Sequence, residues 1–248
     1  MNFATRVSNV ARTLSALAFR PDVVRLAAFG VPPRLALALD QPWLRALDVR
    51  TVLDVGANTG QFALAAQMVF PNAKVHSFEP LPGCFRVLQQ RAARFPAVRV
   101  LNLALGEGAG NVAFNENDYS PSSSVLPLDQ WHRSAFPEAR AVRTVDVKME
   151  RLDTVAESLG IADPLLLKID VQGYEDRVLR GGEGTARRAS VILVETSFVP
   201  LYVGQPSHQT VCEILQSWGF SYVGALDQLC DPHTGRVLSA DSIFVRGS

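Results

Sequence analysis

An acidic residue lies near the end of each of two short apolar runs, and a glycine-containing turn follows the first. Asp54 belongs to the run TVLDV, and the turn Gly56-Ala57-Asn58-Thr59-Gly60 leads from it into a helical segment. Glycines in such a turn allow close backbone approach, so a ligand can lie against the helix N-terminus. Glu79 follows the run KVHSF, where a carboxylate can accept hydrogen bonds from both ribose hydroxyls. The two segments together predict a site for a nucleoside-containing cofactor.

The spacing and charge of the turn discriminate between such cofactors. Its glycines follow G-x-x-x-G rather than G-x-G-x-x-G, and Asp54 would repel a pyrophosphate. S-adenosylmethionine carries an ammonium and a sulfonium, which the same carboxylate attracts. An NAD-dependent oxidoreductase is therefore the second hypothesis, and a non-catalytic protein that binds an adenosyl ligand is the third. Alone, the turn would fit a plain connection between strand and helix equally well.

Two further acids end later apolar runs. Asp170 closes LLLKID (165–170) and Glu195 closes SVILVE (190–195). A charge in such a run is costly without a purpose, and the carboxyl ends of parallel strands are where sites assemble. We therefore expect both acids to face a ligand, with a structural ion pair to Lys168 as the alternative. His76, inside the second run, is expected to be a core histidine whose hydrogen bonds are satisfied.

The elements that position these residues form an α/β pattern. Nearly continuous apolar runs predict strands at 51–55, 74–78, 98–102, 165–170 and 190–195, covered by helices on both faces in a doubly wound, mostly parallel sheet. Extra strands are expected at 111–115 and 141–149, and an antiparallel hairpin at the C-terminal end. Residues 1–48 predict a helical extension that serves as a packing appendage or as a dimer contact, and residues 49–248 the enzyme domain.

Composition narrows the class of protein. The 248 residues are 48% hydrophobic and carry 24 basic against 24 acidic side chains, which fits one α/β domain and disfavours a nucleic-acid partner. Three widely spaced cysteines support neither a disulfide framework nor a zinc site, so we expect a reducing cytoplasm. Arg6, Arg12 and Arg20 interrupt the first apolar stretch, and we expect no signal sequence or membrane span.

Several separate segments resemble the FkbM family of S-adenosylmethionine-dependent O-methyltransferases. They are VLDVGANTGQF, SFEP, NLALGEGAGNVAF, the Ser122-Ser123-Ser124 loop, LLLKIDVQGYEDRVLRGG, ILVETSFVPLYVGQP, and the final Gly219-Phe220 and Asp241-Ser242-Ile243-Phe244. They occur in the family's order over roughly residues 50–246. The resemblance implies a Rossmann-like methyltransferase fold and methyl transfer to a hydroxyl oxygen, on a sugar, a glycolipid or a macrolide-type natural product.

The resemblance also implies roles for individual residues. Asp54, Gly56, Ala57, Asn58 and Gly60 would form the wall at the methionine end of the cofactor, Glu79 would bind the ribose, and Asn102, Ala104 and Leu105 would flank the adenine. Small and aliphatic residues suffice next to adenine because the contact is apolar packing with backbone hydrogen bonds. Asn102 equally fits a turn former at the end of a strand.

Methyl transfer to a hydroxyl requires removal of its proton as the oxygen attacks. Asp170 is the preferred base; Asp170 and Glu195 could alternatively hold a magnesium ion, and His208 is a weaker candidate base. The acceptor pocket is expected near 119–124 and 198–205. There Tyr202 and Trp131 could stack on a sugar ring or simply pack beneath a loop.

Overall fold

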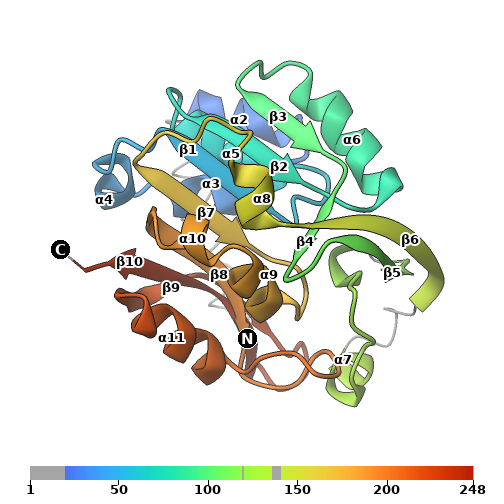
Figure 1. Ribbon diagram of the computed structural model, residues 1–248. Coiled ribbons are helices and arrows are strands. Elements are labelled where there is room, and N and C mark those ends of the chain that lie inside the picture. Colours follow the sequence, from blue (N-terminus) through green and yellow to red (C-terminus); the bar gives the residue numbers. More distant parts are fainter. Residues whose placement is uncertain (1–19, 119, 136–140, 248) are drawn as a thin grey trace.

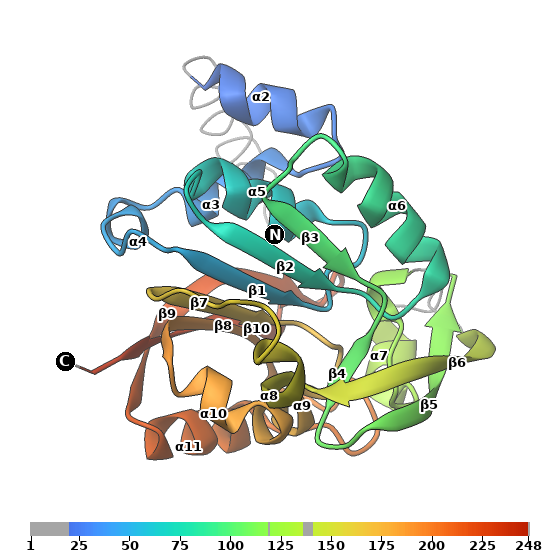
Figure 2. The same cartoon turned by 45° about the horizontal axis from the view of Figure 1, so that its top comes forward.

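The computed structural model describes residues 20–118, 120–135 and 141–247, and a seven-stranded sheet forms its centre (Figures 1 and 2). The strands lie in the order β3-β2-β1-β7-β8-β10-β9. Their bounds are β1 Thr51–Val55, β2 Lys74–Phe78, β3 Val98–Leu101, β7 Leu165–Ile169, β8 Ala189–Ser197, β9 Phe220–Cys230 and β10 Val237–Arg246. The first five run parallel, and β10 pairs antiparallel with both β8 and β9. This confirms the predicted doubly wound, Rossmann-like sheet with its C-terminal hairpin.

Alternating side chains of the strands build a core on each face of the sheet. On one face Val52, Val75 and Leu166 pack with α5 (Gln61–Val69). On the other face Leu53 and Leu167 pack with α9 (Glu175–Gly181) and α11 (His208–Ser217). Figure 2 shows the two layers of helices, with α6 (Pro82–Ala92) beside α5 and with α8 (Leu152–Ala156) and α10 (Glu183–Ala186) beside α9. Because both faces are covered, the strands read as continuous apolar runs.

A second, three-stranded sheet lies beyond the carboxyl edge of the first. Its order is β4-β6-β5, with β4 Ala104–Gly106, β5 Gly110–Asn117 and β6 Ala141–Arg151. The strands expected at 111–115 and 141–149 are both present, whereas β4 was not predicted. The short helices η1 (Ser120–Ser122) and α7 (Gln130–Ala135) follow β5. Paired backbone hydrogen bonds between Asn115 and Ser124 fold this connection back against β5.

Three short helices precede the sheet: α2 (Pro21–Ala27), α3 (Pro33–Leu39) and α4 (Pro42–Arg45). Each has proline in its first turn, where the missing N–H costs no hydrogen bond. Buried residues of α2 and α3, such as Val23 and Leu39, belong to the same apolar cluster as α5. The described part of the predicted extension is therefore helical and shares the core of the sheet, while residues 1–19 of that prediction lie outside the described residues. The boundary at residue 48 stays a prediction.

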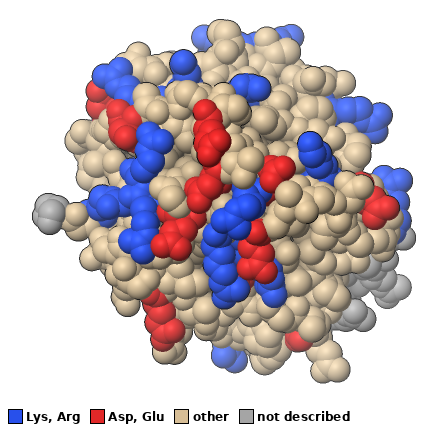
Figure 3. All heavy atoms as spheres, in the orientation of Figure 1, with Lys and Arg blue, Asp and Glu red and all other residues tan. Residues whose placement is uncertain are grey.

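Charges of both signs alternate across the middle of the face drawn in Figure 3. Several pairs there and elsewhere are close, for example Arg187 with Glu183 at 2.8 Å and Arg180 with Asp176 at 3.2 Å. The face shown is therefore not dominated by one sign of charge, in keeping with the equal numbers of acidic and basic residues. Among the described helices, none is long and apolar enough to cross a membrane.

Candidate active site

A cavity of about 280 Å³ opens where β1, β2, β7 and β8 end. Predicted site residues in its wall are Gly56, Ala57, Asn58, Glu79, Ala104, Leu105, Asp170 and Glu195. This position is the switch point of the sheet, where the strand order reverses between β1 and β7 and ligands of doubly wound folds bind. The predicted residues Asp54, Gly60, Asn102 and His208 are not part of the wall.

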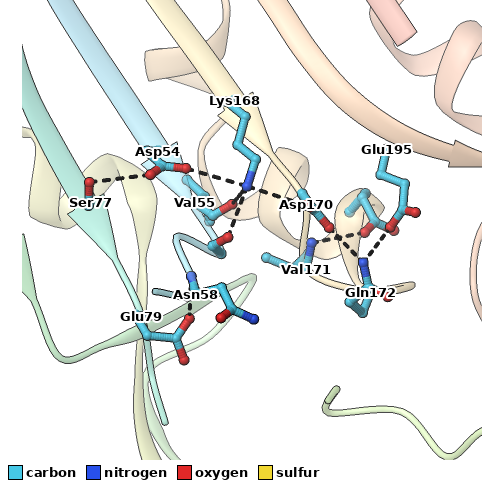
Figure 4. A network of polar contacts seen from close by, with 12 residues as sticks. Asp54, Val55, Asn58, Ser77, Glu79, Lys168, Asp170, Val171, Gln172 and Glu195 are labelled. Atoms are coloured by element: carbon cyan, nitrogen blue, oxygen red, sulfur yellow. Dashed lines mark hydrogen bonds and ion pairs between the residues drawn. The ribbon is translucent and has the colours of Figure 1, made fainter. Parts of the chain in front are cut away.

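Glu79 is held at the end of β2 by two backbone groups. Its Oε2 accepts the N–H of Asn58 (Figure 4) and its Oε1 accepts the N–H of Leu81, both at 2.8 Å. Burial raises the pKa of Glu79 to about 7, against the effect of these hydrogen bonds. Asn102 supports this turn from outside the cavity, since its side-chain amide donates to the carbonyl oxygens of Glu79 and Pro80 at 2.8 and 2.9 Å. The Glu79 carboxylate is thereby fixed beside the turn that follows β1, residues 56–60, which is called the β1 turn below.

The two glycines of the β1 turn make room for the protein's own chain. Gly56 has φ 77°, and a Cβ atom there would lie 1.8 Å from the carbonyl oxygen of Asp170. Gly60 has φ 93°, and its Cβ would lie 2.7 Å from Leu88 Cδ1. We expected these glycines to admit a ligand. At Gly56 the close approach is instead that of the β7 loop, which brings Asp170 to the cavity.

Asp54 lies behind the cavity wall in an ion-paired row (Figure 4). It is completely buried, and the Nζ of Lys168 lies 3.4 Å from Asp54 Oδ1 and 3.4 Å from Asp170 Oδ2. Lys168 also donates to the carbonyl oxygen of Gly56 at 2.9 Å. Burial lowers the pKa of this lysine, but the carboxylates of Asp170 and Asp54 outweigh it and raise the pKa above its usual range. The alternative ion pair between Lys168 and Asp170 is thus present.

Asp170 and Glu195 meet at the side chain of Gln172. Gln172 Nε2 donates to Asp170 Oδ1 and to Glu195 Oε2, each at 2.7 Å (Figure 4). Ser239 Oγ donates to the other oxygen of Glu195 at 2.9 Å. Burial, and then the charge of Asp170, raise the pKa of Glu195 well above its usual range. The sheet therefore brings the two predicted acids together on one wall of the cavity.

Two residues of this wall were missed by sequence reasoning, although both lie within the family-like segments. Gln172 belongs to KIDVQGYE, and Asp241 opens the segment DSIF. Asp241 lies opposite Glu195 in the β10–β8 register, and burial raises its pKa to about 7. The signal that could have found it is an acid in an apolar strand.

The amide of Gln172 also bears on the magnesium alternative. Its Nε2, a hydrogen-bond donor that cannot ligate a cation, stands between the carboxylates of Asp170 and Glu195. Within the described ranges, no group of three or more His, Cys, Asp or Glu side chains is placed to hold a metal ion. The donor set therefore lends the magnesium hypothesis no support.

The other candidate side chains lie away from the cavity or are buried. His208 begins α11, where its Nδ1 is 2.9 Å from Thr196 Oγ1 and its Nε2 is 3.4 Å from Cys212 Sγ. Tyr202 is buried in an apolar cluster with Leu128 and Leu238. Trp131 is 41% exposed, with the guanidinium of Arg236 over its ring. Tyr119 of the expected acceptor loop lies outside the described residues.

His76 differs from the expectation for a satisfied core histidine. It is buried in β2, and neither ring nitrogen has a hydrogen-bond partner in the described structure. Burial lowers the pKa of His76 to about 4, so the ring is neutral at pH 7. Burying ring nitrogens without hydrogen bonds lowers the free energy of unfolding.

Comparison with known proteins identifies the class to which this fold belongs. The pattern of the Methyltransferase FkbM domain matches residues 54–222, more than half of the chain. The protein therefore belongs to the FkbM family of methyltransferases.

Several named proteins are similar in sequence or structure to this chain. The chain is 30% identical over 205 residues to 31-O-demethyl-FK506 methyltransferase FkbM of Streptomyces tacrolimicus, covering 72% of this chain and 75% of the relative. It is 26% identical over 178 residues to 2-O-methyltransferase NoeI of Sinorhizobium fredii, covering 67% and 71%. A solved structure of methyltransferase FkbM from Methylobacillus flagellatus is 12% identical with a TM-score of 0.49, covering 84% of this chain and 47% of that one.

Proposed function

We propose that this protein transfers a methyl group from S-adenosylmethionine to a hydroxyl oxygen of a sugar, a glycolipid or a macrolide-type natural product. The observation that carries the proposal is the Glu79 carboxylate, fixed by two backbone N–H groups on the same cavity as Asp170 and Glu195. The hydroxyl acceptor is inferred from the names of the relatives, which include a 2-O-methyltransferase and a 31-O-demethyl-FK506 methyltransferase.

The residues of the cavity fit this cofactor. Within the described part of the chain, each oxygen of Glu79 accepts one hydrogen bond, so lone pairs remain for the two ribose hydroxyls. Ala104 and Leu105 contribute apolar surface next to Glu79, as a purine ring requires. The carboxylate of Asp170 supplies negative charge for a cationic ligand.

The chemistry assigned to the protein's own groups is proton removal and orientation. S-adenosylmethionine, when bound, supplies a methyl group activated by a positively charged sulfur. Asp170 would accept the proton of the acceptor hydroxyl as the oxygen attacks, because its carboxylate lies on the cavity wall at the end of β7. Gln172 and Lys168 hold this carboxylate through its two oxygens. Glu195 is the neighbouring acceptor of hydrogen bonds.

The proposal is tested by binding and by transfer of a labelled methyl group. Calorimetry should show that S-adenosylmethionine and S-adenosylhomocysteine bind and that NADH does not. Label from S-adenosylmethionine should then appear on an acceptor from a panel of neutral glycosides, glycolipids and macrolides. Binding of NADH without S-adenosylmethionine would instead favour the oxidoreductase. Tight S-adenosylmethionine binding with no transfer to any member of the panel would favour the non-catalytic binding protein.

A further inference from the structure

Gln172 adopts a backbone conformation that side chains rarely take. It lies in the turn between β7 and α9 with φ 59°, and Gly173 follows at φ 94°. A positive φ is unfavourable for any residue with a side chain. Surrounding contacts hold the turn in place: Ser124 Oγ donates to the Gln172 carbonyl oxygen at 2.6 Å, and Glu175 Oε1 accepts the N–H groups of Val171 and Gly173. A strained residue held so firmly points to a task for its side chain.

Both the nitrogen and the oxygen of the Gln172 side-chain amide form hydrogen bonds. Its Nε2 donates to Asp170 and Glu195, and its Oε1 accepts the hydroxyl of Tyr202 at 2.6 Å. The reverse orientation of the amide would set its oxygen against two carboxylate oxygens, so these neighbours fix which end faces the cavity acids. The same Tyr202 hydroxyl lies 3.3 Å from the carbonyl oxygen of Ser122, in the connection beside the cavity.

Each carboxylate is consequently held by both of its oxygens. Gln172 binds Oδ1 of Asp170 while Lys168 lies 3.4 Å from Oδ2. Gln172 likewise binds Oε2 of Glu195 while Ser239 binds Oε1. Because the bridging amide is neutral, it holds the two acids by hydrogen bonds and adds no positive charge to the cavity wall. A lysine or arginine at this position would add one.

We propose that Gln172 is a positioning residue that holds the Asp170 carboxylate beside Glu195 on the cavity wall, so that the cavity favours a cationic ligand. This inference rests on the proposed function. It adds a specificity: the protein prefers S-adenosylmethionine, which bears a sulfonium, to its uncharged-sulfur product S-adenosylhomocysteine. Such a preference favours exchange of product for new cofactor after each transfer.

The variant Gln172→Met tests the proposal, because it keeps the length of the side chain and removes the amide. Without the shared donor, Oδ1 of Asp170 loses its hydrogen bond and this carboxylate is no longer fixed on the cavity wall, so the wall attracts a cation less. Calorimetry at pH 7 should show the ratio of S-adenosylmethionine to S-adenosylhomocysteine affinity falling by about tenfold, a part of the roughly thousandfold that one charge about 4 Å away contributes at an effective dielectric near 20. The affinity for S-adenosylhomocysteine should change much less. Tyr202→Phe, which only frees the amide, should shift the ratio in the same direction by a smaller factor.

Gln209→Met is the matched control. The Gln209 amide also donates to a carboxylate, that of Glu213 at 2.8 Å, but on the exposed side of α11 and outside the cavity wall. This change should leave the affinity ratio unaltered. If Gln172→Met and Tyr202→Phe also leave the ratio unaltered, or weaken both ligands equally, the proposed role of Gln172 is wrong. If the wild-type protein binds neither ligand, the proposed function itself fails.

Discussion

At the scale of single residues, the proposed function depends on the protonation state of Glu79. Burial brings its pKa to about 7, so a substantial fraction of the free protein carries a neutral Glu79 at neutral pH. A ribose that donates two hydroxyl hydrogen bonds needs the ionised carboxylate, which is the stronger acceptor. Binding of the cofactor and loss of this proton are therefore linked.

The affinity for S-adenosylmethionine should accordingly weaken as the pH falls below about 7, by up to about tenfold per pH unit. In Glu79→Gln, affinity should be about 10- to 100-fold weaker at pH 8, since charge-assisted hydrogen bonds are replaced by neutral ones. The same variant should also lose most of the pH dependence, because the amide does not titrate. Calorimetry between pH 5.5 and 8.5 measures both effects. A wild-type affinity that is flat across this range would contradict the role given to Glu79.

A second prediction concerns Asp170 as the base. Asp170→Asn keeps the size of the side chain and its contact with Gln172 but removes the basicity. Turnover, measured as labelled methyl transferred to the acceptor found in the panel, should fall by roughly two to four orders of magnitude, with little change in the affinity for S-adenosylhomocysteine. If Asp170 served only the ion pair with Lys168, the variant would melt earlier and retain its turnover per folded molecule.

At the scale of elements, the strands of the central sheet could be predicted because their side chains are buried on both faces of the sheet. β1 and β2 have the predicted bounds, since apolar runs buried on both faces leave little ambiguity about a strand. β4 was missed because three residues, Ala104–Gly106, carry no periodicity and form a strand only by pairing with the distant β6. The hydrogen bond between Tyr202 and Gln172 was not predicted for the same reason. It joins two loops that are far apart in the sequence.

The packing of β1 against the β7 loop yields an element-scale prediction. Gly56→Ala would place a Cβ 1.8 Å from the Asp170 carbonyl oxygen, in a residue whose φ is 77°. The two elements must then separate, and we expect the free energy of unfolding to fall by more than about 3 kcal/mol, with weaker S-adenosylmethionine binding. Gly108→Ala is the control, because nothing lies within 4 Å of its Cβ, and it should change stability by less than about 0.5 kcal/mol. Urea unfolding compares the two, and equal stabilities would show that the approach at Gly56 is not tight.

At the scale of the whole molecule, the buried carboxyls and the buried histidines make opposite contributions to the pH dependence of stability. Burial raises the pKa of five acids: Asp54, Glu79, Glu175, Glu195 and Asp241. Between their ordinary pKa and the raised one, the folded state binds more protons than the unfolded state, so stability increases as the pH falls. Burial lowers the pKa of His76, His132 and His208. Below about pH 6.5 the unfolded state therefore binds protons at these histidines that the folded state does not, and stability decreases as the pH falls.

The ligand-free protein should therefore be more stable at pH 6.5 than at pH 8. The three acids with a pKa of about 7, Glu79, Glu175 and Asp241, take up protons in this interval, and together they should add about 2 kcal/mol to the free energy of unfolding. Below pH 6.5 the histidines oppose the acids and the curve should level off. Glu175→Gln is the informative variant, because its amide oxygen can still accept the N–H groups of Val171 and Gly173 while no charge is buried. It should be more stable than wild type at pH 8 and gain less on acidification. Thermal melts at pH 8, 6.5 and 5 measure this, and a melting temperature that stays constant or falls from pH 8 to 6.5 would mean that these acids stay ionised in the folded protein.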